Sequence, residues 1–176
     1  MKKQILLYFL FIVIQLSCSE NPAVQVFVSG SDGHKSYRIP AIISHPDGTI
    51  LAFAEGRVRG SGDFGDINIV LRRSTDHGKT WDRMLTVVDY DSLQAGNPAP
   101  VIDLTDPDYP DGRIFLFYNT GNNHEGEVRK GNGYREVWYI TSADGGTTWS
   151  DPVNITASVH RLNKPEIGRA SCRERV

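Results

Sequence analysis

One octet of the sequence occurs twice. Ser74-x-Asp76-x-Gly78-x-x-Trp81 recurs as Ser142-x-Asp144-x-Gly146-x-x-Trp149, a spacing of 68 residues from position 74 to position 142. Ser and Asp side chains accept hydrogen bonds from backbone N–H groups in tight turns, Gly adopts a positive φ, and Trp can anchor the turn on a core. Octets that share Ser, Asp, Gly and Trp at the same four positions, at equivalent points of two units, indicate repeated architecture. We therefore interpret them as structural turns rather than as a catalytic pair made by Asp76 and Asp144, because each Asp is used by its own turn.

Short strands surround each octet. The strand-like run 67–73 leads into the first octet and has Ile67, Ile69 and Leu71 at alternate positions, as expected for one face of a strand. The runs 39–44 and 49–55 before it flank Asp47-Gly48, a strong hairpin pattern. Four short antiparallel strands in one unit are typical of a propeller blade. The sequence therefore predicts an all-β protein. The remaining strands are expected at 84–88 in the first unit and at 99–104, 113–120 and 134–141 in the second, and residues 151–160 are expected to begin a third.

The N-terminus has the pattern of an export signal. Residues 1–4 are polar and positively charged, and residues 5–14 are an unbroken apolar run, too short to span a membrane and of the size of a secretory h-region. We interpret residues 1–20 as a signal peptide and expect an exported protein: periplasmic, secreted or an outer-membrane lipoprotein. Cys18 follows Leu-Ser, which resembles a lipoprotein signal with Cys18 as the lipidated residue; ordinary cleavage nearby is the alternative.

Composition excludes several classes of function. The two cysteines, Cys18 and Cys172, do not make a disulfide scaffold, and a formal net charge of −2 gives no case for nucleic acid or an anionic membrane surface as a partner. A membrane partner would be reached only through a lipid on Cys18. The histidines of the first unit lack the spacing of metal ligands, so no metal site is expected.

A polar loop between the second and third strands is the place where chemistry is expected. It contains Arg57, Arg59, Asp63 and Asp66 and is rich in Gly. Such a loop is too charged to lie in a core, and functional side chains are common on loops that a rigid scaffold holds.

Tyr37-Arg38-Ile39-Pro40, together with the two octets, which are known as Asp boxes, resembles the bacterial exo-α-sialidases (neuraminidases). That family begins with a Phe/Tyr-Arg-Ile-Pro motif and folds as a six-bladed β-propeller with its site at the centre of one face. The resemblance extends from Tyr37 to Lys164. It implies a six-bladed propeller of which this chain holds about the first two to three blades.

The resemblance also implies roles for four side chains. Arg38 matches the first of three arginines that bind the C1 carboxylate of sialic acid, and a planar guanidinium suits a carboxylate because it forms two parallel charge-assisted hydrogen bonds. Arg57 matches an arginine that contacts the sugar near its 4-hydroxyl, and Asp103 resembles an acid near the same hydroxyl. Asp63 matches the general acid/base, with Asp66 as its nearest competitor.

The implied reaction is retaining hydrolysis of terminal sialic acid from glycoproteins, glycolipids or oligosaccharides, with no cofactor. Sialidases use a Tyr nucleophile. Asp63 would protonate the leaving oxygen, which calls for a raised pKa or a shielded position. Two alternatives stay open: a trans-sialidase, intermolecular or intramolecular, which shares these residues, and a non-catalytic glycan-binding propeller that keeps the Asp boxes. A placed acid favours the enzymes, because a lectin does not need one.

Only part of such a propeller is expected in this sequence. Residues 21–165 are interpreted as its N-terminal part and residues 166–176 as an anomalous tail that resembles translated adaptor sequence. The other two carboxylate-binding arginines, the Tyr nucleophile and its Glu base belong to later blades of the family. The chain by itself is therefore expected to be inactive.

Overall fold

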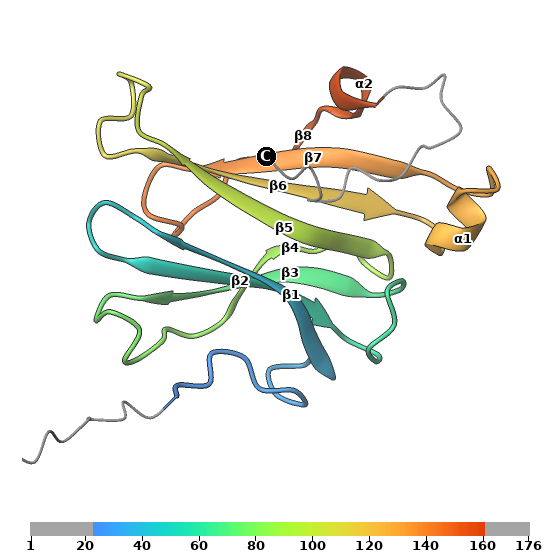
Figure 1. The fold of residues 1–176 in the computed structure, drawn as a ribbon, viewed down its shortest axis with the longest axis horizontal. Coiled ribbons are helices and arrows are strands. Elements are labelled where there is room, and N and C mark those ends of the chain that lie inside the picture. The colour runs from blue at the N-terminus through green and yellow to red at the C-terminus, as the bar shows by residue number, and fades with distance from the viewer. Residues whose placement is uncertain (1–22, 161–176) are drawn as a thin grey trace, which may run out of the picture.

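The computed structural model describes residues 23–160. The lipidation predicted for Cys18, the signal peptide and the tail at 166–176 lie outside these residues. Strands dominate the described part (Figure 1), as the sequence predicts. The elements in chain order are β1 Ser36–Ser44, β2 Ile50–Arg57, β3 Ile67–Ser74, β4 Leu85–Val88, β5 Gln94–Asp103, β6 Arg113–Gly121, α1 Glu125–Val128, β7 Arg135–Ser142, β8 Val153–Asn154 and α2 Thr156–Val159.

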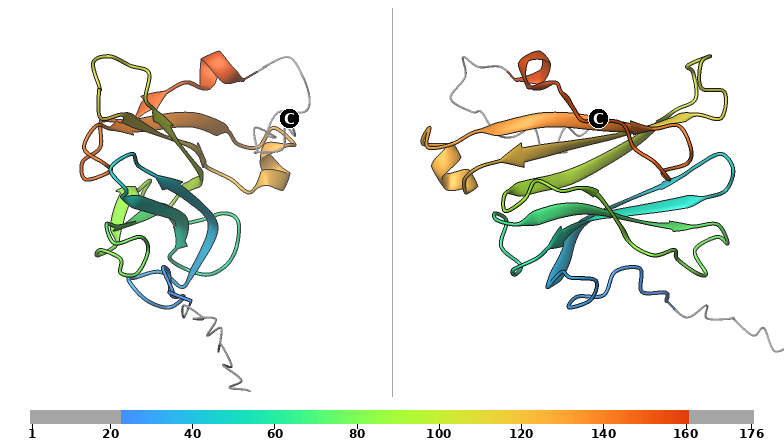
Figure 2. Two further views of the ribbon diagram at one scale, coloured as in Figure 1. Left: turned by 60° about the vertical axis from the view of Figure 1, so that its left-hand side comes forward. Right: turned by 180° about the vertical axis from the view of Figure 1, so that it is seen from behind.

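The strands form two four-stranded antiparallel units of the kind expected for propeller blades. Strands β1 to β4 pair in sequence order in the first blade, and β5 to β8 do the same in the second. Among the described residues, the parallel pair of Ile67 with Gln94 joins the two sheets. Figure 2 shows that the two blades lie one over the other as twisted layers. The all-β fold class and the blade arrangement are thus confirmed.

The hydrophobic core lies between the two blades. It is formed by side chains of β2, β3 and β4 from the first blade and of β5, β6 and β7 from the second. The core residues are Leu51, Phe53, Ile69, Leu71, Val88, Ala95, Ile114, Leu116, Tyr118 and Ile140, all at most 8% exposed. Trp149 of the second Asp box reaches across to Phe53, with ring centroids 6.0 Å apart in an edge-on arrangement. The second box therefore helps to join the blades.

Both Asp boxes form the turns that their composition predicts. Ser74 Oγ accepts a hydrogen bond from Gly78 N–H at 2.8 Å and donates one to Asp76, whose carboxylate also accepts from the backbone and hydroxyl of Thr80. Ser142 and Asp144 make the same contacts in the second blade. Each Asp is thus engaged by its own turn.

The first strand of each blade contains a bulge. In β1 the register shifts between Arg38 and Ala41, and in β5 it shifts between Gly96 and Ala99. A bulge lets a proline sit inside a strand, because the residue there is left out of the ladder. This explains why β5 begins at Gln94, earlier than the run 99–104 that the sequence predicts.

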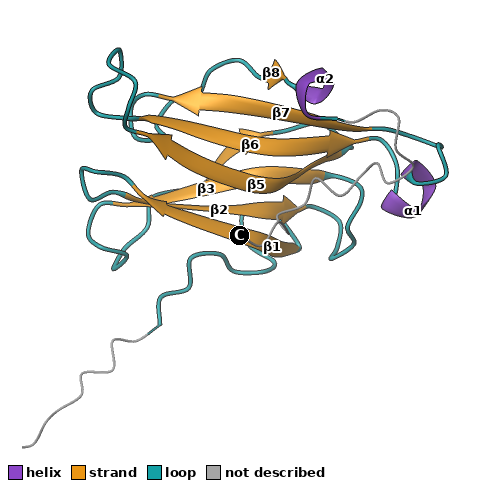
Figure 3. Ribbon diagram, turned by 45° about the horizontal axis from the view of Figure 1, so that its top comes forward, coloured by secondary structure: helices purple, strands orange, loops and turns teal. Residues whose placement is uncertain are grey.

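Two local features differ from the sequence expectations. Val153 and Asn154 do not begin a third blade: they pair with Tyr139 and Trp138 of β7 and form the outer strand of the second blade, as β4 does in the first. Within the described residues, α1 lies between β6 and β7 and α2 follows β8 (Figure 3). Each has four residues, too few for a helical period to be recognised in the sequence. None of the helices within residues 23–160 is long and apolar enough to cross a membrane.

Candidate active site

The predicted site lies where the ends of several strands meet, and this end of the two sheets is called the site edge below. The strand registers place Ser36, Arg57, Ile67, Gln94 and Gly121 side by side in a single row across both blades. The loop at residues 58–66 and the connection that contains α1 both leave the sheet at this edge, at the right of Figure 1. Residues far apart in sequence therefore meet here.

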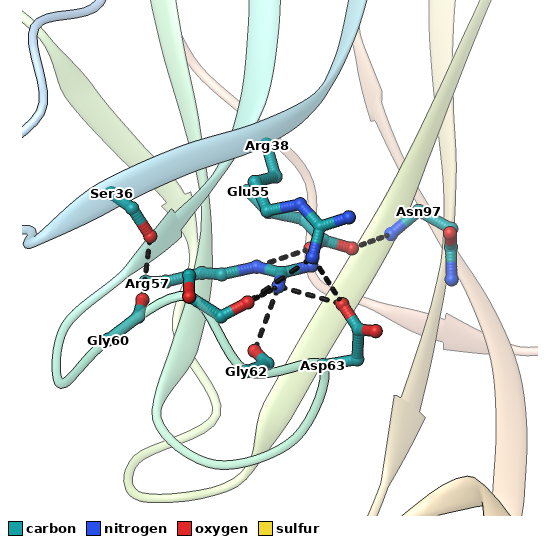
Figure 4. Close-up of polar contacts among 9 residues, drawn as sticks. Ser36, Arg38, Glu55, Arg57, Gly60, Gly62, Asp63 and Asn97 are labelled. Atoms are coloured by element: carbon teal, nitrogen blue, oxygen red, sulfur yellow. Dashed lines mark hydrogen bonds and ion pairs between the residues drawn. The ribbon is translucent and has the colours of Figure 1, made fainter.

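The structure brings three of the predicted side chains together. Asp63 Oδ1 accepts hydrogen bonds from Arg38 Nη1 at 2.9 Å and from Arg57 Nη1 at 2.8 Å (Figure 4). The side chain of Asp63 is 71% exposed and that of Arg38 is 46% exposed. Arg38 also donates from Nη1 to the carbonyl of Ser61 at 3.2 Å. A solvent-accessible cation and a solvent-accessible carboxylate thus lie next to each other at the open edge.

Arg57 has a different environment from the one that the resemblance implies. Its side chain is 3% exposed, and its Nη1 donates to the carbonyls of Ser61 and Gly62 as well as to Asp63. Its Nε and Nη2 donate to Glu55 Oε2 at 3.0 and 2.5 Å. In this arrangement Arg57 holds the loop and its carboxylate in place rather than presenting a free guanidinium to a ligand.

The charges around Asp63 favour its ionised form. The hydrogen bond from Arg57 holds the pKa of Asp63 below its ordinary value, and the charges of Arg57, Arg38 and His124 act in the same direction, against a smaller opposing effect of burial. This is opposite to the raised pKa that a general acid calls for. Without a ligand, the site therefore presents an ionised carboxylate near neutral pH.

The other two predicted carboxylates lie elsewhere. Asp66 accepts a hydrogen bond from Val58 N–H through its backbone carbonyl, and its carboxylate is not a partner of Arg38 or Arg57 among the described residues. Asp103 is the last residue of β5, opposite Arg113, at the far end of the strand from Gln94. Its carboxylate caps the turn that follows by accepting from the N–H and hydroxyl of Thr105. The structure does not bring Asp103 to the candidate site.

Two residues at this edge were missed by the sequence analysis. Glu55 is 2% exposed and lies two residues before Arg57, which puts both side chains on one face of β2. Asn97 lies in the β5 bulge, and its backbone N–H donates to Glu55 Oε1 at 2.9 Å. The available indication was the spacing Glu-x-Arg for Glu55 and, for Asn97, the match of Asn97-Pro98 to Ile39-Pro40 in the first blade.

The cluster is balanced in charge. Arg38 and Arg57 face Glu55 and Asp63, so two cations oppose two anions. Within residues 23–160, no group of three or more His, Cys, Asp or Glu side chains is placed to hold a metal ion. In chemical terms, a half-exposed guanidinium such as that of Arg38 can bind an anion, and an exposed carboxylate such as that of Asp63 can accept a proton.

Comparison with known families agrees with this fold. A family model described as a BNR repeat-like domain matches residues 48–172. The chain belongs to this BNR-repeat family. The matched range includes both Asp boxes, which are the repeats that first indicated a propeller.

Proteins with sequences similar to this BNR-repeat domain include sialidases. An exo-alpha-sialidase of Aspergillus fumigatus is 35% identical over 159 residues, which cover 78% of this chain and 38% of that protein. A sialidase of Paraclostridium sordellii is 35% identical over 133 residues, covering 73% of this chain and 32% of that protein. The chain thus spans about a third of the length of these relatives.

Solved sialidase structures share the fold. The Hadza microbial sialidase Hz136 superposes with a TM-score of 0.62 at 26% identity, covering 73% of this chain and 28% of that one. The BNR-repeat domain described here therefore corresponds to part of a sialidase β-propeller, which confirms the family resemblance seen in the sequence.

Proposed function

We propose that this chain forms the first part of an exo-α-sialidase that hydrolyses terminal sialic acid from glycoconjugates with retention of configuration. The observation that carries the proposal is the pairing of Arg38 with Asp63 at the open edge of the blades. A sialoside has a carboxylate and a glycosidic oxygen on the same carbon. A cation and a carboxylic acid side by side match these two groups.

Arg38 is assigned to the substrate carboxylate. Only its Nη1 has a partner among the described residues, which leaves its other N–H groups for a carboxylate. A guanidinium is suited to this because its fork of donors matches two carboxylate oxygens.

Asp63 is assigned as general acid/base, and substrate binding would prepare it for that role. A bound carboxylate would compete with Asp63 for Arg38 and would add a negative charge beside it, and the sugar would displace water from an exposed side chain. Each effect raises the pKa of a carboxyl group. The lowered pKa of Asp63 in the ligand-free site is thus compatible with a protonated acid in the complex.

The nucleophile is assigned to a Tyr, with a Glu as its base, outside residues 23–160. A neutral phenol approaches the anomeric carbon more readily than a carboxylate does, because the substrate carries a negative charge next to that carbon. Two further arginines from the same outside part would complete the carboxylate site.

A non-catalytic glycan-binding propeller is the second candidate. The observation that favours it is that Arg57 and Arg38 lower the pKa of Asp63, which suits a carboxylate that accepts hydrogen bonds from sugar hydroxyls. Such a protein would bind sialosides without turnover.

The test uses the full-length protein that contains this chain. The protein is incubated with sialyllactose, and the first sialic acid released is observed by proton NMR before it mutarotates. Release of the α-anomer supports retaining hydrolysis. Binding of sialyllactose without release supports the glycan-binding alternative, and neither binding nor release contradicts both.

A further inference from the structure

We infer that Glu55 is a positioning residue that fixes the two blades' contributions to the site relative to each other. The carboxylate contacts Arg57 with one oxygen and the backbone of Asn97 with the other, so it connects β2 of the first blade with β5 of the second. The effect of Glu55 on catalysis rests on the proposed function, whereas its coupling of the loop at residues 58–66 to the β5 bulge does not.

On the first-blade side, Glu55 acts through Arg57. Both Nε and Nη2 of Arg57 donate to Glu55 Oε2, which fixes the plane of the guanidinium. That plane aims Nη1 at Ser61 O, Gly62 O and Asp63 Oδ1, at 2.6, 2.8 and 2.8 Å. Glu55 therefore sets the position of the candidate acid, Asp63, indirectly, through Arg57.

On the second-blade side, Glu55 acts on the bulge of β5. Asn97 has φ +54°, a conformation that costs free energy in a non-glycine residue and persists only where its surroundings hold it. The hydrogen bond from Asn97 N–H to Glu55 Oε1 is such a restraint. A Cβ on the preceding residue, Gly96, would lie 2.6 Å from the same oxygen, so the backbone of β5 approaches Glu55 as closely as a glycine permits.

A purely stabilising role would not require this geometry. A buried ion pair often contributes little net stability, because desolvation of both charges offsets their attraction. Glu55 is 2% exposed, and its second oxygen is used for one backbone N–H in the other blade. The contacts of Glu55 are thus distributed in the way that alignment of two segments demands.

The first test measures amide hydrogen exchange by mass spectrometry in the full-length protein. In Glu55→Gln, the amide nitrogen of the new side chain meets a donor on one side or the other, so Glu55's two contacts cannot both survive. We expect faster exchange in residues 58–66 and in residues 94–99 together. Glu136→Gln is the control, because Glu136 is a carboxylate of the second blade that contacts Thr120 and Trp138 instead.

Gly96→Ala gives an independent variant that leaves Glu55 intact. Gly96 has no positive φ, so the added methyl group acts by displacing the Glu55 carboxylate. We expect faster exchange in residues 58–66, although position 96 belongs to the other blade. If exchange changes only in residues 94–99 in this variant, or in only one of the two segments in Glu55→Gln, the coupling does not exist.

The second test asks whether positioning matters for proton transfer. A misplacement of about 1 Å can reduce turnover on the order of 10²-fold, so Glu55→Gln should lower kcat on sialyllactose by roughly that factor. An aryl sialoside with a good leaving group needs less protonation by Asp63, and its kcat should fall much less. Equal losses on both substrates would show that Glu55 does not act through the acid. If the unmutated protein releases no sialic acid, the proposed function fails, and the exchange data still decide the inference.

Discussion

Ile39 and Asn97 occupy equivalent positions in the two blades. Each lies in the bulge of its blade's first strand, each has a positive φ, +51° and +54°, and each precedes a proline. The two bulges lie at the candidate site, where Ile39 follows Arg38 and Asn97 contacts Glu55. The repeated unit of this protein therefore includes a strained bulge as well as an Asp box.

The strain at Ile39 can be tested directly. A β-branched residue at positive φ is a conformational outlier, and the left-handed region costs about 1–2 kcal/mol for a residue with a Cβ. Ile39→Gly should therefore leave the free energy of unfolding unchanged or raise it, because relief of strain offsets the lost side chain. Chemical denaturation measures this. Ile42→Gly is the control in the same strand: Ile42 is exposed and has no positive φ, so the change should be destabilising. Equal destabilisation by both would show that Ile39 is not strained.

The glycines of the two Asp boxes should differ in their tolerance of a methyl group. Gly78 and Gly146 both have φ +82°, so alanine is strained at either position, by about 1–2 kcal/mol. A Cβ at Gly146 would also lie 2.5 Å from Leu51 Cδ2, whereas at Gly78 it would meet nothing closer than 3.9 Å. Overpacking of this kind costs a further 1–3 kcal/mol, roughly, so Gly146→Ala should be the more destabilising change in thermal unfolding. A larger loss of stability in Gly78→Ala than in Gly146→Ala would contradict this prediction.

The carboxylates of the boxes should make stability depend on acid pH. Hydrogen bonds from Thr80 and Ser74 lower the pKa of Asp76 to about 2. Those from Thr148 and Ser142 lower that of Asp144 to about 2 against an opposing effect of burial. A carboxyl group whose pKa is lowered in the folded state stabilises it above the unfolded pKa of about 3.9, and this contribution is lost as pH falls toward 2. Asp144→Asn should therefore be destabilised near neutral pH and approach the unmutated protein near pH 2. A constant difference across this range would contradict the assignment.

The fold could be predicted from local patterns, because the features that determine it recur along the chain. Alternation in the run 67–73, the Asp47-Gly48 turn and the paired Asp boxes each specify a local structure, and together they specify blades. The expectation that residues 151–160 begin a third blade was wrong, because Val153 pairs with Tyr139 in the second blade and a strand of two residues has no periodicity to identify it. Val153 follows Trp149 at the same distance as Leu85, the first residue of β4, follows Trp81. This equivalence would have predicted that Val153 belongs to the fourth strand of the second blade.

The site could be predicted only in part. Arg38, Arg57 and Asp63 converge as expected, because the ends of β1 and β2 and the loop between β2 and β3 share one edge. The contacts of Asp103 could not be predicted in this way. The sequence shows that an acid ends a strand, but it does not show at which end of the sheet that strand end lies. The coupling of Glu55 to Asn97 depends on a parallel pairing between blades, which no local pattern encodes.

The two acids of the loop should differ in their effect on turnover. In the full-length protein, Asp63→Asn should lose most activity on sialyllactose, because Asp63 is the carboxylate next to Arg38. General acid catalysis contributes on the order of 10²–10⁴-fold, and an aryl sialoside with a good leaving group should be affected less. Asp66→Asn is the control from the same loop and should lose little on either substrate. A larger loss in Asp66→Asn would assign the acid to Asp66.

The chain expressed alone should associate with itself and show no turnover. The outer face of the second blade carries Val101 opposite Phe115, and Phe117 opposite Tyr139, with the three aromatic rings within 6.0 Å of one another. Val101 on this face is 53% exposed. Contiguous apolar surface of this kind promotes association, and a single carboxylate-binding arginine, Arg38, does not make the three-arginine site that the proposal requires. Sedimentation velocity of residues 23–160 should show an average mass that increases with protein concentration. Val101→Lys should reduce this association. Val24→Lys is the control at another exposed valine and should leave the association unchanged. A monomeric chain that melts cooperatively and releases sialic acid from an aryl sialoside would show that the two blades are sufficient.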